Sequence, residues 1–337
     1  MKKLLFISLF AALLAAGCSK DDIGGGNDGG DGGNGGGTKI PTNEIWYTSS
    51  DGNIVEPYSG AGAAKYPFGE GVEIVSNTYE NGRGVIKFSA PVTEIGISAF
   101  SSCFSLTSVT IPDSVTTIEL GAFGRCFSLT SVTIPDSVTS IGEGVFLGCS
   151  NLTSITIPNS VTTIGDWAFY NCSSLTSITI PDSVTMIGWG AFRDCSNLKA
   201  FYGKFASADN RCLIVNGVLK SFAPAGLTEY TIPDRVTEIG DDAFRDCSSL
   251  TSVTIPDSVT EIEGSAFRDC SSLTSVYCKA ATPPTLESDV FKYYYYNGVY
   301  KILENLTAIY VPRESVEAYK AAKNWSDYAH LIQPYDF

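Results

Sequence analysis

Residues 106–127 read LTSVTIPDSVTTIELGAFGRCF, and this stretch carries the features that decide the fold. Residues 108–111 alternate polar and β-branched apolar side chains, which predicts a short strand. Pro112 fixes the first corner of a turn. Residues 115–118 are a second extended segment, and Ala122 begins a short helical or 3₁₀ turn.

The stretch recurs with a period of 23 residues. Three kinds of residue keep this spacing independently: Pro112, Pro135, Pro158 and Pro181; Cys103, Cys126, Cys149, Cys172 and Cys195; and Phe100, Phe123, Phe146, Phe169 and Phe192. Pro233 and Pro256 repeat it, as do Cys247 and Cys270. A unit of this length cannot enclose its own apolar face, so successive units must stack around a shared core. The period therefore predicts a β-rich solenoid.

The pattern L-x-x-V-x-I-P-x-S-V-x-x-I-x-x-x-A-F-x-x-C resembles the BspA-like class of bacterial leucine-rich-repeat proteins. Units begin at Leu106, Leu129, Leu152, Leu175, Leu227, Leu250 and Leu273. A degenerate first coil places Ile86, Phe88, Val92, Ile95, Ala99 and Phe100 at the same positions. The resemblance implies a leucine-rich-repeat right-handed superhelix with short strands and short helical or 3₁₀ turns. It also implies a cell-surface protein, of a class in which some members bind host matrix or plasma proteins.

The N-terminus has the pattern of an export signal. Residues 1–18 read MKKLLFISLFAALLAAGC, with two lysines, an apolar run and small residues before Cys18. This ending resembles the bacterial lipobox, which implies a signal peptide over residues 1–17, lipidation of Cys18 and anchoring in the outer membrane. The alternative is an ordinary cleavage site. Residues 18–43 are rich in glycine and predict a flexible tether; a calcium-binding glycine repeat is a weaker interpretation.

Both ends of a solenoid need lids, because open ends expose apolar columns and unpaired strand edges. We expect a β cap over residues 44–82, the repeats over 83–305, and a last strand with a capping helix over 306–337. The helix is predicted over residues 315–331. Its apolar side would carry Val316, Tyr319, Ala322 and Trp325.

Two segments depart from the period. Near residues 203–226 the sequence predicts a β-hairpin around Asn216 and Gly217, and we expect it to project from the solenoid. Near residues 287–305 four consecutive tyrosines, Tyr293–Tyr296, indicate a loop-like insertion.

The composition disfavours several functions. A formal net charge of −14 argues against nucleic acid as a partner, and membrane contact is expected only through the lipid. His330 is the single histidine, so histidine-dependent catalysis and multi-histidine metal sites lack their residues. The aspartates after the repeat prolines are explained by the turn. We expect no catalytic residue, no metal and no cofactor.

The cysteine column is interpreted as buried free thiols, since equivalent side chains in stacked coils point the same way. Cys212 and Cys278 lie outside the column, and a bridge between them is left open. Arg193, Arg245 and Arg268, each followed by aspartate, predict a solvated salt-bridge ladder. The Asp-Ser-Val turns also resemble an O-glycosylation sequon.

Candidate binding residues fall into three groups. Ser154, Thr156, Ser177 and Thr179 belong to outward columns of hydroxyls, which are either a soluble face or a broad contact surface. Trp167, Tyr170 and Trp189 occupy no core column and serve either stacking on a ligand or local packing. Tyr294 and Tyr295 lie in the second insertion.

These features together predict a surface-anchored adhesion module that binds an extracellular or host matrix protein without catalysis. Glycan capture is one alternative, and a structural spacer at the cell surface is the other.

Overall fold

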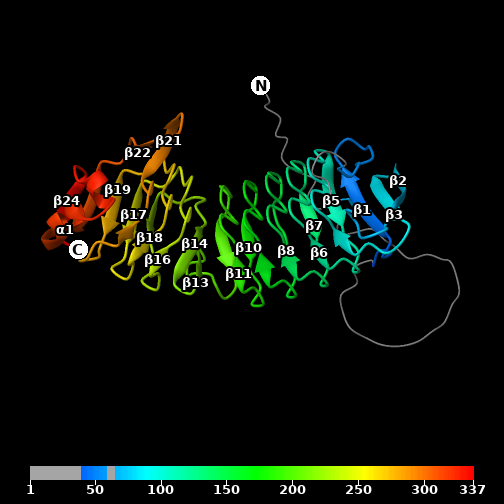
Figure 1. Ribbon diagram of the computed structural model, residues 1–337, viewed down its shortest axis with the longest axis horizontal. Coiled ribbons are helices and arrows are strands. Elements are labelled where there is room, and N and C mark those ends of the chain that lie inside the picture. The colour runs from blue at the N-terminus through cyan, green and yellow to red at the C-terminus, as the bar shows by residue number, and fades with distance from the viewer. Residues whose placement is uncertain (1–38, 59–64) are drawn as a thin grey trace, which may run out of the picture. The chain divides into compact units, whose positions relative to one another are not determined.

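Most coils of the solenoid contribute one short strand to each of two parallel ladders (Figure 1). This computed structural model describes residues 39–58 and 65–337. The described chain is a β-solenoid of about 11 turns with little helix, which confirms the predicted fold class. The signal peptide, Cys18 and nearly all of the tether lie outside the described residues.

The first ladder comes from the strand that opens each coil. Its N-terminal part contains β5 (Leu106–Thr110) and β7 (Ser131–Thr133), then β10 (Ser177–Thr179) and β12 (Ala200–Tyr202). Its C-terminal part contains β15 (Glu229–Thr231), β17 (Ser252–Ile255), β19 (Ser275–Cys278), β23 (Ala308–Pro312) and β24 (Ile332–Tyr335). Identical repeat positions pair, as in Val253 opposite Val276, so the apolar columns stay in register.

The second ladder comes from the strand after the proline turn. It contains β4 (Glu94–Ile95), β6 (Thr117–Ile118), β8 (Ser140–Ile141), β9 (Thr163–Ile164) and β11 (Met186–Ile187). After an interruption it continues with β14 (Val218–Phe222), β16 (Glu238–Ile239), β18 (Glu261–Ile262) and β20 (Thr285–Leu286). A turn segment, for example residues 188–195, follows this strand in most coils.

Phenylalanine and cysteine recur together because they complete one packing unit. Phe100 and Phe123 stack with ring centroids 5.3 Å apart. The Cys126 thiol donates to the carbonyl oxygen of Phe100 at 3.0 Å. The same bond recurs along the column, and burial raises the pKa of the Cys195 thiol to about 12. A thiol thus fills the core and satisfies a carbonyl group at once.

Hydrogen bonds bear on two other hypotheses from the sequence. Cys212 contacts the Tyr230 hydroxyl, whereas Cys278 contacts that of Tyr319, so the two cysteines form no bridge with each other. The turn serines that resemble a glycosylation site are half-buried. Ser183, for example, donates to the carbonyl oxygen of Val161 at 2.7 Å. This bond between adjacent coils is a structural reason for serine to recur at the turn.

Three antiparallel strands close the N-terminal end: β1 (Glu44–Ser49), β2 (Ile74–Glu80) and β3 (Arg83–Phe88). The sheet order is β2-β3-β1-β5-β7, so β1 separates β3 from β5. Ile86 and Phe88 therefore do not pair with the next coil. They are nonetheless buried in the core, as are Val92, Ile95, Ala99 and Phe100.

The hairpin near residues 203–226 forms but does not project. β13 (Cys212–Val215) pairs antiparallel with β14 around Asn216 and Gly217, which both have positive φ, as a tight hairpin turn requires. However, β14 also pairs in parallel with β16, and Leu213 and Leu219 are fully buried. Burying these apolar side chains in the core is more favourable than leaving them exposed on a projecting hairpin. β14 therefore supplies a strand of the second ladder.

The tyrosine insertion is a hairpin rather than a loop. β21 (Lys292–Tyr296) pairs with β22 (Val299–Ile302) around Asn297 and Gly298, and the two strands form a sheet of their own. This tyrosine hairpin, residues 292–302, extends beyond the neighbouring coils (Figure 1).

The C-terminal cap is shorter in helix than predicted. η1 (Arg313–Ser315) leads into α1 (Val316–Ala321), and η2 (Trp325–Tyr328) follows. The left-handed conformation of Asn324 separates α1 from η2. Tyr319 and Trp325 are fully buried, so the apolar side was identified correctly although the helix length was wrong. β24 then adds a parallel strand to β23.

Both ladders are interrupted in the long coil, residues 198–226. β12 is not paired with β15, and β11 is not paired with β14. The buried side chains likewise form two clusters that meet here, with Leu213 in the first and Cys212 in the second. This coil also lacks a turn segment, because residues 223–227 lead directly from β14 toward the next coil.

Candidate binding surface

Trp167 and Trp189 lie in contact on the turn segments of adjacent coils. Their ring centroids are 4.9 Å apart at 65°, and the Trp167 N–H donates to the Trp189 carbonyl oxygen at 2.9 Å. Trp189 is 40% exposed, whereas Trp167 is half-buried. The structure therefore brings the two predicted tryptophans together as one partly exposed aromatic pair.

Trp167 adopts a backbone conformation that suits glycine. Its φ is 51°, and the equivalent residues of neighbouring coils are Gly144 and Gly190 with φ of 57°. A bulky residue at positive φ costs about 1 kcal/mol or more. A β-carbon on Gly190 would lie 3.0 Å from Trp167 Cδ1, so that glycine leaves room for the indole. The tryptophan is a costly local departure, which makes it a functional candidate.

Tyr170 contacts an arginine. Its ring lies below the Arg193 guanidinium, with 5.1 Å from Cζ to the ring centroid. Burial, then the charge of Asp194, raises the pKa of Tyr170. Tyr170 thus belongs to the charged cluster that follows it along the solenoid.

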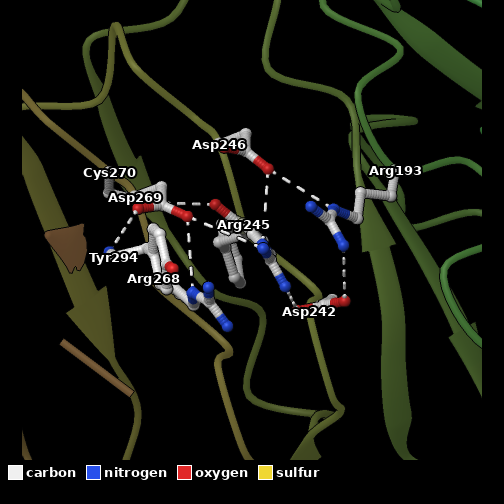
Figure 2. Close-up of polar contacts among 9 residues, drawn as sticks. Arg193, Asp242, Arg245, Asp246, Arg268, Asp269, Cys270 and Tyr294 are labelled. Carbon is white, nitrogen blue, oxygen red and sulfur yellow. Dashed lines mark hydrogen bonds and ion pairs between the residues drawn. The ribbon is translucent and has the colours of Figure 1, made fainter. Parts of the chain in front are cut away.

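Arg193, Arg245 and Arg268 form a ladder with three aspartates, shown in Figure 2. The arginine side chains are only 14%, 12% and 14% exposed, so the prediction of a solvated ladder is wrong. Because the long coil lacks a turn segment, the Arg193 side chain spans the gap to the next one. The contact of Arg193 with the next turn segment was not predicted from the sequence. Arg193 and Arg245 are 52 residues apart, a spacing that is not a multiple of the 23-residue period.

Asp242 is the buried centre of this ladder. Its carboxylate is 1% exposed and lies 3.4 Å from Arg193 Nη1 and 3.1 Å from Arg245 Nη1. Asp246 accepts from Arg193 Nε at 3.4 Å. Burial, then the facing carboxyl group of Asp194, raises the pKa of Asp246 to about 6. These groups line a cavity of about 230 Å³.

The ladder ends at the tyrosine hairpin. Asp269 lies 3.7 Å from Arg245 Nη2, and its Oδ1 accepts the Tyr294 N–H at 3.2 Å. The Arg268 guanidinium lies 4.5 Å from the Tyr300 ring centroid. Tyr294 and Tyr295 are 51% and 56% exposed. A continuous series of contacts therefore joins Tyr170 to the exposed hairpin.

The hydroxyl candidates lie elsewhere in the coil. Ser154, Thr156 and Thr179 are exposed and Ser177 is half-exposed. Ser177 and Thr179 lie in β10, and Ser154 and Thr156 hold the equivalent positions of the preceding coil, whereas the tryptophans follow the second strand. Residues 154–156 are assigned to no strand, so the first ladder has a further interruption at this coil.

Within residues 39–58 and 65–337, no three histidine, cysteine, aspartate or glutamate residues are placed to hold a metal ion. Among the helices of that part, none has the length and apolarity to cross a bilayer.

The fold and its columns define a β-solenoid of leucine-rich repeats. The profile of the BspA type leucine rich repeat region matches six copies, over residues 73–199 and 219–312. The chain belongs to the BspA-type leucine-rich-repeat family. No curated protein matches it.

Several solved structures are similar. A leucine rich cell surface protein from Faecalibacterium prausnitzii is 27% identical with a TM-score of 0.48, covering 73% of this chain and 77% of that one. A leucine rich repeat protein from T. pallidum is 28% identical with a TM-score of 0.38, covering 55% and 73%. The pneumococcal vaccine antigen PcpA is 17% identical with a TM-score of 0.43, covering 78% and 88%.

Proposed function

We propose that this protein is a lipid-anchored adhesion module of the outer membrane that binds an extracellular or host matrix protein. The repeat family supports a role as a binding scaffold. The pattern ending at Cys18 supports export and lipidation, and the glycine-rich tether would let the solenoid reorient above the membrane.

The exposed tyrosine hairpin is the observation that carries this proposal. Tyrosine offers a large amphipathic contact area with few rotamers to immobilise, which suits it to protein interfaces. Tyr295 is further held by Lys301, whose Nζ lies 3.4 Å from the ring centroid. The hairpin is thus partly preorganised, a condition that lowers the entropic cost of binding.

No catalytic step is assigned to this surface. The carboxylates of the ladder are engaged by arginines, and the single histidine, His330, lies in the C-terminal cap. We interpret the aromatic and charged residues as a contact surface.

A binding screen tests the proposal directly. The compact unit Lys39–Phe337, immobilised without its lipid, would be offered extracellular matrix and plasma proteins. We expect saturable binding of at least one of them. Absence of binding across the panel would favour the structural spacer. Separately, Cys18→Ala should release the full chain from membranes and abolish labelling by radioactive palmitate.

A further inference from the structure

The missing turn segment leaves backbone groups unpaired on both sides of the long coil. In regular coils, alternate N–H groups of one turn segment donate to carbonyl groups of the next, as Phe169 does to Ala191 at 2.8 Å. In the described part of the chain, the corresponding N–H groups at the gap have no acceptor: those of Gly190, Phe192 and Asp194. The carbonyl oxygens of Asp241, Ala243 and Arg245 likewise receive no N–H donor there.

The gap contains a second recess besides the one closed by Arg193. This recess has a volume of about 270 Å³ and is lined by Trp189, Gly190, Lys220, Asp241 and Glu263, with residues 187–188. Lys220 is exposed and forms no ion pair within the described residues. The recess therefore remains open, unlike the arginine ladder beside it.

The recess combines an aromatic ring, a backbone N–H group and acidic side chains. Trp189 supplies an exposed apolar ring, and Gly190 supplies a free N–H donor. Glu263 Oε2 accepts the Asp241 N–H at 2.7 Å, which fixes the two acidic residues relative to each other. Burial, then the charges of Asp242, Glu263 and Glu287, raises the pKa of the Asp241 carboxyl to about 6. Among the described residues, none donates a hydrogen bond to the Asp241 carboxylate.

An aromatic ring beside carboxylates, an ammonium group and a free N–H matches the surface of a sugar. A sugar ring has an apolar C–H face that packs on aromatics, and hydroxyls that both donate and accept. The volume lies just below the ~300–1,000 Å³ of pockets for drug-sized ligands, which indicates one ring. An amine ligand is disfavoured because Lys220 already places a cation there.

We propose that this recess binds a single pyranose unit of a glycan. Its apolar face packs on Trp189, and its hydroxyls contact Asp241, Glu263, Lys220 and the Gly190 N–H. The site is separate from the tyrosine hairpin, so it adds a ligand class to the proposed protein contact and does not depend on it.

Saturation-transfer NMR and calorimetry on the full chain test the site. The probes are glucose, galactose, mannose, fucose, N-acetylglucosamine, N-acetylgalactosamine and N-acetylneuraminic acid. At least one should bind, and Trp189→Ala and Asp241→Asn should each weaken it by about tenfold or more. Trp46→Ala, at a half-buried tryptophan of β1, and Tyr294→Ala should leave sugar affinity unchanged.

Three results would overturn the assignment. The first is that no sugar binds at millimolar concentration to the folded wild-type chain. The second is that binding survives both recess variants while circular dichroism confirms their fold. The third is that the diamine cadaverine, but no sugar, occupies the recess. Loss of sugar binding alone leaves the protein-binding screen unaffected, so failures of the two proposals are distinguishable.

Discussion

The guanidinium of Arg193 reaches across the gap in the solenoid to the buried carboxylate of Asp242, with Nη1 and Oδ2 3.4 Å apart. Asp242 also binds Arg245. One side chain therefore links the turn segments on both sides of the missing one.

Removal of this carboxylate should destabilise the protein. Asp242→Asn keeps the side-chain shape and tolerates the positive φ of 57°, but leaves two largely buried guanidinium groups with weaker partners. We expect a loss of about 2–3 kcal/mol in the free energy of unfolding, because breaking a buried ion pair exposes its partner to an uncompensated desolvation cost. Urea denaturation measures this free energy.

A control variant is Asp136→Asn, at an exposed turn, which should change stability by less than about 0.5 kcal/mol. Equal effects in both variants would contradict the role of Asp242.

The ladder should also make stability depend on pH. The pKa of Asp246 is about 6 in the folded protein, above the ordinary value of 3.8, so the folded state holds the proton more tightly than the unfolded state. Stability from this group is present at low pH and is lost as pH rises from about 4 through 6. Asp246→Asn removes this titration. The urea midpoint of the variant minus that of wild type should therefore become more positive between pH 4 and pH 7. A difference that stays constant over this range would exclude the effect.

The buried thiols should be unreactive in the folded state. Burial raises the pKa of Cys149 to about 12, and that of the half-buried Cys103 to about 12 as well, so little thiolate exists near neutral pH. Ellman's reagent should label the native Lys39–Phe337 unit slowly and all nine cysteines after unfolding in urea. Fewer than nine reactive thiols in fully unfolded protein would indicate disulfides and refute the interpretation of the column.

The fold could be predicted because several columns carried one period. Leucine, phenylalanine and cysteine each repeat at a spacing that only stacking explains, and Cys126 bonded to Phe100 shows why two of them recur together. The two hairpins were harder to place. Both contain Asn-Gly turns, yet Leu213 and Leu219 bury one hairpin in the core while the tyrosine-rich one stays exposed. The alternation of polar and apolar residues within a hairpin does not reveal whether another part of the chain packs against it.

The binding surface could be predicted only in part. Trp167 and Trp189 were identifiable because they interrupt columns of smaller residues. The partnership of Arg193 with Asp242 was not, since it arises from a turn segment that the chain omits. The recess near Trp189 has the same origin, as Lys220 reaches it from a strand whose place in the second ladder required the three-dimensional structure.

The measurement that tests the central claim most directly compares partner binding by two forms of the Lys39–Phe337 unit. One is wild type, and the other carries Tyr294→Ser, Tyr295→Ser and Tyr296→Ser, at residues that are all more than half exposed. A matched control carries Ser131→Ala and Thr133→Ala on the exposed strand face. For the matrix or plasma protein found in the screen, we predict dissociation at least about tenfold faster for the tyrosine variant and unchanged for the control. Unchanged binding by a folded tyrosine variant would contradict the account.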